Sequence, residues 1–299
     1  MTSSVVEKTT TPSGLWDRVR TYVALTKPRI IELLLITTVP AMVLAAQGWP
    51  GTWLVLATLI GGTLSAAGAN TLNSYFDRDI DELMGRTKKR PLPVHGVEAR
   101  NALWFGIALG VAGFAWLWVF TNLTAALWST AALLFYVVVY TILLKRTTTQ
   151  NIVIGGAAGA APALVGWAAV TGGVGLPAWI LFAIVFYWTP PHFWALALRY
   201  KADYATASVP MLPVVRGRTA TVRQILLYST IMVWLTLLLV PVAGMGWVYM
   251  IGAIGLGAWF FWESWRMTKS DTEPIRLFTA SNIYLAALSA VIVADVLIR

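Results

Sequence analysis

Three oxygen-bearing side chains recur at four-residue intervals in the stretch NSYFDRDIDELMGRTKKRPL, residues 73 to 92: Asn73, Asp77 and Asp81. On a helix, residues four apart share one face and rise about 6 Å per step, so the three form one stripe of oxygens. Such a stripe suits a hard divalent cation, because Mg²⁺ takes one or two protein carboxylates and completes its shell with waters and phosphates. The spacing therefore predicts a Mg²⁺ site with Asn73, Asp77 and Asp81 as ligands.

A row of cations follows the stripe, and it includes Arg86, Lys89 and Arg90. Arginine can hold a phosphate through a bidentate fork and lysine as a point charge, so these residues could neutralise a phosphate that completes the metal shell. The alternative is a solvated loop beside a membrane span. We interpret Asp79 and Glu82, which lie off the stripe, as such a solvated face.

A second connection repeats this chemistry in LALRYKADYATASVPMLPVVRGR, residues 196 to 218. It carries Arg199, Lys201 and Asp203 after an apolar span of similar kind. Two connections that both join a carboxylate to cations favour a binding site over two unrelated solvated loops.

The elements that position these residues are membrane helices. The 299 residues are 58% hydrophobic and only 12% charged, whereas about a quarter of the residues of a soluble domain are charged. Some 20 apolar residues span the hydrocarbon core as a helix, and lipid-exposed backbone must be paired within its own segment. We predict an all-α polytopic membrane protein with nine transmembrane helices, near residues 29–47, 52–73, 101–120, 123–144, 151–171, 178–199, 220–242, 247–265 and 277–298.

No soluble domain interrupts the spans, so we predict one domain over residues 1–299, with a polar N-terminal tail over about residues 1–20. The tail has neither the features of a secretory signal nor those of an Arg-rich transit peptide. Glycine-rich runs at 61–70 and 154–166 lie inside spans, and we interpret them as helix-packing surfaces rather than phosphate loops. The absence of cysteine excludes disulfides and thiolate metal sites.

The distribution of charge predicts the orientation. Of 22 Lys and Arg residues, 21 fall in the N-terminal segment and alternate connections, and only Arg299 falls on the other side. By the positive-inside rule, the N-terminus is cytoplasmic and the C-terminus outside. The net charge of +9 is thus explained by the lipid bilayer as a partner, and we expect no nucleic acid.

Four blocks of the chain carry a family resemblance: YVALTKPRIIELLLITT (22 to 38), NSYFDRDIDELMGRTKKRPL, YTILLKRTTTQNIVIGGAAGA (140 to 160) and WTPPHFWALALRYKADYATASVPMLPVV (188 to 215). The N-x-x-x-D-x-x-x-D stripe followed by R-T-x-x-R-P-L resembles the signature of the UbiA superfamily of intramembrane prenyltransferases. Within it, the chain is most similar to the heme O synthase family, or protoheme IX farnesyltransferases. The resemblance covers nearly the whole chain and implies a UbiA-like helix bundle around an intramembrane cavity.

What the resemblance implies, residue by residue, is a prenyl diphosphate site. Asn73, Asp77 and Asp81 would hold Mg²⁺ against the diphosphate. Its counter-charges would be four cations: Arg86, Arg90, Lys145 and Arg146. The catalytic set implied is Asn73, Asp77, Asp81, Lys145 and Asp203.

The second connection departs from the superfamily's pattern, which has a carboxylate pair at i and i+4. The matching positions here are Arg199 and Asp203, so a cation replaces one carboxylate. The resemblance then implies Asp203 as a water-mediated metal ligand and Lys201 and Arg199 as diphosphate contacts.

A polar residue inside a span is costly and is a functional candidate. His192, in the sixth predicted span after Pro190 and Pro191, is such a residue. Three roles stay open for it: a hydrogen bond to a neighbouring helix, an axial contact to haem iron, or a place near a reacting vinyl group. Tyr140 is one of several aromatic residues that could line a cavity for a macrocycle and an isoprenoid.

The implied reaction is transfer of a farnesyl group from farnesyl diphosphate to heme B, both of them substrates, with Mg²⁺ as the cofactor. The resemblance also implies the cell membrane as the location, and heme A synthase or oxidase assembly factors as candidate partners. Two alternatives stay open. One is another UbiA-type enzyme of the quinone or chlorophyll kind, and the other is a lipid or anion carrier, which would need no Mg²⁺ stripe.

Overall fold

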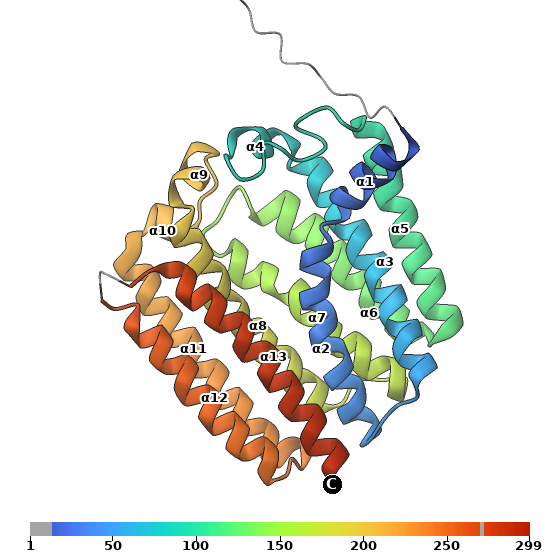
Figure 1. The fold of residues 1–299 in the computed structure, drawn as a ribbon, viewed down its shortest axis with the longest axis vertical. Helices are drawn as coiled ribbons and strands as arrows, with labels where there is room; N and C mark the ends of the chain where they lie inside the picture. Colours follow the sequence, from blue (N-terminus) through green and yellow to red (C-terminus); the bar gives the residue numbers. More distant parts are fainter. Residues whose placement is uncertain (1–13, 270–271) are drawn as a thin grey trace, which may run out of the picture.

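The computed structural model describes residues 14–269 and 272–299, without the side chains of residues 29, 30 and 32–35. In this part of the chain every regular element is a helix. Figure 1 shows long helices packed side by side, with the short helices gathered at one end of the bundle. The elements are α1 (Leu15–Thr26), α2 (Pro28–Ala46), α3 (Thr52–Phe76), α4 (Arg78–Leu83), α5 (Ala99–Phe120), α6 (Leu123–Leu134), the π-helix η1 (Phe135–Leu144), α7 (Asn151–Thr171), α8 (Leu176–Arg199), α9 (Lys201–Thr206), α10 (Leu212–Val215), α11 (Gly217–Ala243), α12 (Trp247–Arg266) and α13 (Pro274–Ile298).

All nine predicted spans are helical. Seven helical segments of the described chain are long and apolar enough to cross a membrane: α3, α5, α6 with η1, α7, α8, α11 and α13. The described part of α2 has a shorter apolar stretch, Ile36–Ala46, and α12 is not among the seven. The fold class is confirmed as an all-helical membrane bundle, whereas the count of nine membrane crossings stays a prediction.

The predicted polar tail differs from the structure at its inner end. Helix α1 begins at Leu15, inside the segment expected to be a tail, and residues 1–13 lie outside the described part of the chain. Leu15 and Trp16 on this helix are exposed. The helix ends at Thr26, where Lys27 takes a left-handed conformation, and Pro28 opens α2 at the first helical position, which suits proline.

Local signals in the sequence set several other helix ends. The side chain of Asn122 accepts a hydrogen bond of 2.9 Å from the backbone N–H of Ala125 and so caps α6. Gly172 and Gly244 end α7 and α11 in the left-handed conformation that glycine adopts without steric cost.

Two groups of helices pack through a shared centre. Helix α3 makes its most extensive contact with α5, and α6 joins α5 to α7. Helices α11 and α12 pack together on the other side, against α8 and α13. Between them, α2, α7, α8 and α13 contact one another in a closed ring, so the largest buried cluster of apolar side chains draws on α2, α7, α8 and α10 to α13.

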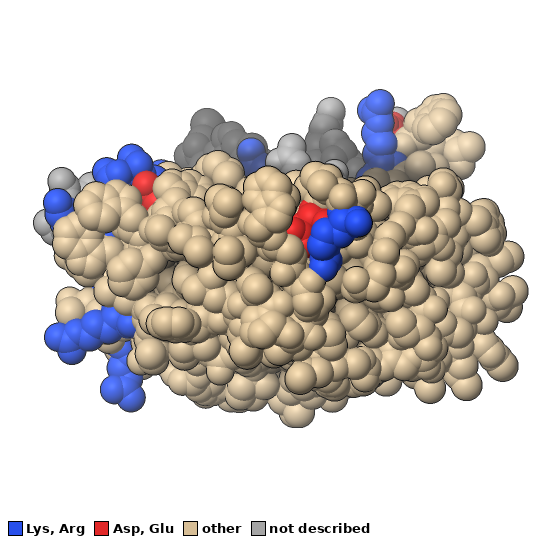
Figure 2. Space-filling view, turned by 90° about the horizontal axis from the view of Figure 1, so that it is seen from below, with Lys and Arg blue, Asp and Glu red and all other residues tan. Residues whose placement is uncertain are grey.

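Charge is distributed unequally between the two ends of the bundle. Helices α1, α4, α9 and α10 lie at one end, and the C-terminus lies at the other (Figure 1). Figure 2 looks onto the end with the C-terminus and shows a mostly uncharged surface, with one group of acidic and basic side chains near its centre and other charged side chains towards its edges. The connections on this side, at 47–51, 121–122, 172–175 and 244–246, contain no Lys, Arg, Asp or Glu.

The contact between α3 and α5 depends on glycine, as the small residues of 61–70 predict. A Cβ atom at Gly68 would lie 2.8 Å from the carbonyl oxygen of Gly106, and one at Gly113 would lie 2.8 Å from the backbone nitrogen of Ser65. Without a side chain, the two backbones approach closely enough to pack well in a membrane. Because Asn73 lies in the last turn of α3, this contact also positions the oxygen stripe.

We predict that Gly68→Ala destabilises the bundle, by about 1–3 kcal/mol, because the added methyl group meets backbone atoms that cannot rotate away. Gly62→Ala is the matched control on the same helix, since a Cβ there has nothing within 4 Å. The measurement is the midpoint temperature at which detergent-solubilised protein loses its monodisperse size-exclusion peak. Equal midpoints for both variants would show that α3 and α5 do not depend on this close approach.

Candidate active site

The oxygen stripe lies where α3 ends. The expected single helix through residues 73–81 is interrupted: α3 ends at Phe76, Asp77 has φ −93° and ψ 2°, and α4 begins at Arg78. The spacing survives the break, because the N–H of Asp77 donates to the carbonyl of Asn73 at 2.9 Å and the N–H of Asp81 to that of Asp77 at 2.8 Å. The three side chains therefore follow one another as predicted, on two helices rather than one.

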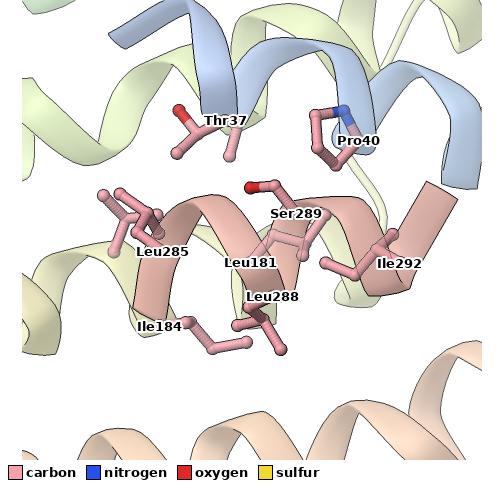
Figure 3. A pocket seen from close by; sticks show the side chains of 10 residues that line it. Thr37, Pro40, Leu181, Ile184, Leu285, Leu288, Ser289 and Ile292 are labelled. Atoms are coloured by element: carbon pink, nitrogen blue, oxygen red, sulfur yellow. The ribbon is translucent and has the colours of Figure 1, made fainter. Parts of the chain in front are cut away.

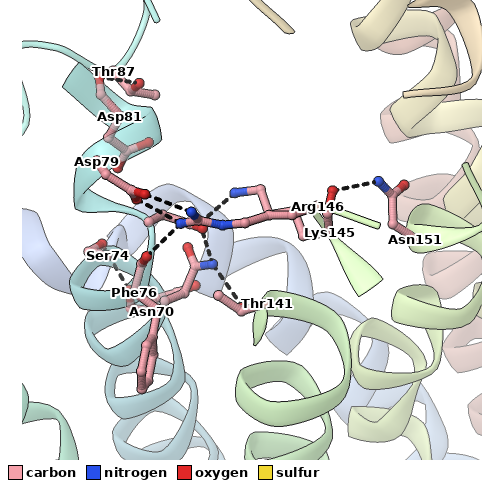
Figure 4. Close-up of polar contacts among 12 residues, drawn as sticks. Asn70, Ser74, Phe76, Asp79, Asp81, Thr87, Thr141, Lys145, Arg146 and Asn151 are labelled. Carbon is pink, nitrogen blue, oxygen red and sulfur yellow. Dashed lines mark hydrogen bonds and ion pairs between the residues drawn. The ribbon is translucent and has the colours of Figure 1, made fainter. Parts of the chain in front are cut away.

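Asn73 and Asp77 belong to a buried polar network. The side-chain nitrogen of Asn73 donates to Asp77 Oδ2 at 2.7 Å and to Thr141 Oγ1 at 3.0 Å, while its oxygen accepts from Lys27 Nζ at 2.6 Å. Lys145 Nζ also donates to Asp77 Oδ2. Figure 4 shows Lys145 and Arg146, which follow η1, reaching towards the end of α3. The network brings the amide of the stripe and its first carboxylate together with two cations.

Asp81 has its own cation. Both oxygens of its carboxylate accept from Arg90 Nη1, at 3.0 and 2.8 Å, and the carboxylate is almost wholly buried. Thr87 Oγ1 donates to the carbonyl oxygen of Asp81 at 2.9 Å and ties the connection back to α4. The two carboxylates of the stripe are thus each paired with a cation that the sequence placed near a diphosphate.

The residues present fit a Mg²⁺ ion that is bound together with a phosphate. Asp77 Oδ1 is fully buried and has no hydrogen-bond partner in the described structure, and such an orphaned carboxylate oxygen is costly unless a ligand satisfies it. Among the described residues, no three His, Cys, Asp or Glu side chains gather into a metal site. A site of two carboxylates and an amide is therefore incomplete without other oxygens, which is how proteins usually hold Mg²⁺ beside a phosphate.

Arg146 and Asp79 form a separate, exposed pair. Arg146 Nη1 and Nη2 both donate to the Asp79 carboxylate at 2.6 Å, and Nη2 also donates to the carbonyl oxygen of Phe76 at 2.8 Å (Figure 4). Hydrogen bonds from Arg146 lower the pKa of Asp79 below its usual value. Asp79 lies off the stripe, as the spacing predicts, and it holds Arg146 at the end of α3.

A second cluster joins the two acidic connections. The backbone N–H of Arg86 donates to Asp203 Oδ2 at 3.2 Å, and the Arg86 guanidinium lies 5.7 Å from the centre of the Tyr200 ring. Tyr200 and Tyr140 both pack against an apolar cluster that includes Ile80, Met84 and Tyr204. Burial raises the pKa of Tyr204 above its usual value. Asp203, expected to be a water-mediated metal ligand, is thus bonded to the first connection.

The Tyr140 ring packs against a glycine of α7. A Cβ atom at Gly155 would lie 2.4 Å from the Tyr140 ring, so only glycine leaves room for the ring at this position. Tyr136, one turn earlier on η1, stacks with Tyr140 at a ring-centre distance of 5.3 Å. The ring of Tyr140 therefore has a fixed place beside the polar network.

Three predicted phosphate contacts stand apart from the network. Lys89, Arg199 and Lys201 are exposed, and within the described chain no hydrogen bond or ion pair joins them to the oxygen stripe. Arg199 is the last residue of α8, and Lys201 is the first of α9. Their part in binding a diphosphate stays a prediction.

His192 lies buried between α8 and α13. Its Nδ1 is 2.8 Å from Ser281 Oγ, and its ring stacks on Trp188 at a centre-to-centre distance of 4.3 Å. Of the three roles left open by the sequence, a hydrogen bond to a neighbouring helix is present.

Sequence reasoning missed three residues of the network: Lys27, Thr141 and Asn151. Burial lowers the pKa of Lys27 to about 7. Asn151 is fully buried, its side-chain nitrogen donates to the carbonyl of Lys145 at 3.1 Å, and its oxygen has no partner in the described structure. All three lie in blocks that carry the family resemblance, which was the available signal, but each is a single polar residue with no spacing to mark it.

A small cavity lies in the ring of central helices. It has a volume of about 20 Å³, room for roughly one water molecule, and Figure 3 shows Thr37 and Pro40 on α2 facing Leu285 and Ser289 on α13. Leu181 and Ile184 of α8 are among the other residues that line it. It shares no residue with the polar network and is too small to hold an isoprenoid.

Comparison with known proteins places this architecture among prenyltransferases. The sequence profile of the UbiA prenyltransferase family matches residues 34–287. A protein of Parafrankia sp. (strain EAN1pec) named protoheme IX farnesyltransferase is 54% identical over 287 residues, covering 94% of this chain and 92% of its own. Its namesake in Clavibacter sepedonicus is 52% identical and covers 95% of both chains.

Solved structures show the same fold. One, from work on digeranylgeranylglyceryl phosphate synthase in membranes, has a TM-score of 0.77 at 17% identity and covers 95% of this chain and 100% of its own. A UbiA homologue from Archaeoglobus fulgidus, bound to GPP and Mg²⁺, has a TM-score of 0.71 at 18% identity, with 92% and 99% covered. At these identities the likeness concerns the fold alone.

We predict that Asp77→Asn abolishes joint binding of Mg²⁺ and inorganic diphosphate, because the amide removes the charge of the orphaned oxygen while keeping its shape. The measurement is calorimetric titration of purified protein. Glu82→Gln, which removes an exposed carboxylate of the adjoining helix α4, is the control and should bind as the unaltered protein does. Retained binding in folded Asp77→Asn protein would remove the stripe from the site.

Proposed function

Because the chain belongs to the UbiA prenyltransferase family, we propose that it transfers the farnesyl group of farnesyl diphosphate to a vinyl group of heme B, giving heme O and diphosphate. The observation that carries this proposal is identity of 50% or more, over almost the full length, to proteins named protoheme IX farnesyltransferase. The product serves heme-copper oxidases, so a heme A synthase or an oxidase assembly factor is a candidate partner.

The polar network suits release of a diphosphate. We assign Asn73, Asp77 and Asp81 to Mg²⁺, which when bound supplies Lewis-acid stabilisation of the departing diphosphate. Lys145, Arg90 and Arg146 are held in place by the carboxylates with which they pair. Preorganised cations of this kind stabilise negative charge as it develops on the leaving group.

When metal and diphosphate bind, the charged side chains of the network exchange partners, and no new charge is introduced into the protein. In the network, Lys145 pairs with Asp77, and Arg90 pairs with Asp81. A metal ion and a diphosphate that arrive together carry opposite charges, so the carboxylates can turn to the metal and the cations to the diphosphate. A bound anion would also favour the charged form of Lys27, which lies next to Asn73.

The rest of the reaction occurs in an apolar environment. Ionisation of the allylic C–O bond gives a carbocation, the vinyl carbon attacks it, and water adds to the resulting benzylic-type cation with release of one proton. Tyr136 and Tyr140 lie beside the network and exclude water from the allylic carbon. We assign Arg86, Lys89, Arg199 and Lys201 to outer contacts of the diphosphate, and Asp203 to holding the turn at Arg86.

The test of this function is mass spectrometry of haems from membranes with and without the protein. Expression in a host that lacks heme O should produce heme O, whose mass exceeds that of heme B by a farnesyl group and one hydroxyl group. Asp77→Asn, expressed to the same level, should not. Unchanged haem but a newly prenylated quinone would identify another enzyme of the family, and no new product would favour a carrier.

We further propose that the protein lies in the cell membrane with its cationic end, and therefore the polar network, on the cytoplasmic side. The partition of 21 of 22 cations supports this orientation. The chain contains no cysteine, so single cysteines can report the side directly.

We predict that cysteines replacing Val94 and Thr219, both exposed at the cationic end, resist a membrane-impermeant maleimide applied to intact cells, whereas one replacing Gly173 reacts. In inverted vesicles the pattern should reverse. Labelling of the first two positions from outside intact cells would overturn the orientation and the cytoplasmic placing of the site.

A further inference from the structure

Ser281 on α13 is hydrogen-bonded twice by α8. Trp188 Nε1 donates to its carbonyl oxygen at 2.8 Å, and His192, one turn later on α8, lies with Nδ1 2.8 Å from its hydroxyl oxygen. Ser281 is itself fully buried. A histidine and a tryptophan of one helix thus converge on a single serine of another.

The hydrogen bonds fix which nitrogen of His192 carries the proton. The Ser281 hydroxyl has one proton, and it donates that proton to the carbonyl oxygen of Phe278 at 2.7 Å. It can therefore only accept from His192, so Nδ1 carries the N–H. In an uncharged imidazole the other nitrogen, Nε2, is then left with a free lone pair.

The ring is also held in one orientation. Trp188 stacks on it at 4.3 Å with an interplanar angle of 24°, and Phe278 lies at 4.5 Å with an angle of 31°. Aromatic rings and the Ser281 bond thus restrain the ring, and in the described structure Nε2 has no hydrogen-bond partner. In the described part of the chain, the fully buried side-chain polar atoms without a partner belong to Asp77, Asn151, Trp194 and Asn282. His192 Nε2 is not one of these fully buried atoms.

This is the arrangement that metal-binding histidines use. A histidine ligand commonly donates its second N–H to a neighbouring oxygen, which sets the tautomer and ring orientation. The network of Asn73 and Asp77 needs a hard cation and oxygen ligands, whereas an imidazole nitrogen suits iron. Iron reaches this protein, under the proposed function, as the centre of a substrate.

We propose that His192 Nε2 is an axial ligand of the haem iron and that Ser281 is the positioning residue that presents it. This rests on the proposed function, since it assigns the place of the haem substrate. Ligation by a residue of α8 would fix the macrocycle relative to the diphosphate site, because Arg199 at the end of the same helix lies about 10 Å further along.

The small number of histidines in the chain simplifies the test of this proposal. It contains two histidines, and the other, His95, lies in the connection at the cationic end. We would purify the protein with a tag that lacks histidine and titrate it with ferric haem, following the absorption spectrum for the signature of nitrogen ligation. His95→Ala is the matched control.

We expect the unaltered protein and His95→Ala to give the same nitrogen-ligated spectrum. His192→Gly should lose it, and free imidazole added to this variant should restore it, which a packing role would not do. Ser281→Ala should weaken haem binding about 10-fold to 100-fold, the usual effect of removing the partner of a ligating histidine, and Ser281→Thr should restore it. Diphosphate binding should be unchanged in all of these variants.

A nitrogen-ligated spectrum in His192→Gly without imidazole would overturn the proposal while leaving the farnesyl transfer standing, provided that membranes with the unaltered protein contain heme O. Failure of His192→Gly to fold would be revealed by its size-exclusion profile. In that case the two Ser281 variants test the proposal. Equal haem affinity in Ser281→Ala and Ser281→Thr would overturn it. If the unaltered protein binds no haem and makes no heme O, both the proposed function and this inference fail.

Discussion

A carboxylate buried at the end of a membrane helix must have a compensating charge, and in this protein the Asp77 carboxylate meets Lys145. The pair joins α3 to the segment after η1, and the same Asp77 oxygen accepts from Asn73. The other oxygen is left without a partner. The helix packing around it can be understood as a means of holding this half-satisfied group in place: α5 packs closely against α3, and Lys27 reaches Asn73 from the turn between α1 and α2.

The arrangement separates two kinds of chemistry along one bundle. Charges gather at the end that carries α1, α4 and α9, where the cations are paired with carboxylates and available to an incoming anion. Deeper in α8, His192 is surrounded by aromatic rings. Under the proposed function, the charged end would hold the diphosphate and the aromatic part of α8 would hold the macrocycle, and the reacting carbons would meet between them.

Much of the fold could be predicted from the sequence because lipid imposes a simple rule on length and polarity. Helix α11 spans Gly217–Ala243 where residues 220–242 were expected, and α7 spans Asn151–Thr171 as predicted. The break at Asp77 could not be foreseen, since spacing of four residues is equally compatible with a continuous helix. The π-helical form of η1 and the helix α1 inside the expected tail likewise depend on packing that periodicity does not reveal. Of the site, the stripe and the cations that follow it, such as Arg90, came from residue type and spacing, and Lys145 and Arg146 came from the family resemblance. Lys27, Thr141 and Asn151 enter the site only through tertiary contacts.

We propose that the Asp77 carboxylate exchanges its lysine for a metal when substrate binds. The most direct measurement is an experimental structure of the protein with Mg²⁺ and an unreactive thio analogue of farnesyl diphosphate. We expect Asp77 Oδ1 to ligate the metal and Lys145 Nζ to have moved from the carboxylate to a phosphate oxygen. A metal bound elsewhere, with Lys145 still paired to Asp77, would contradict it.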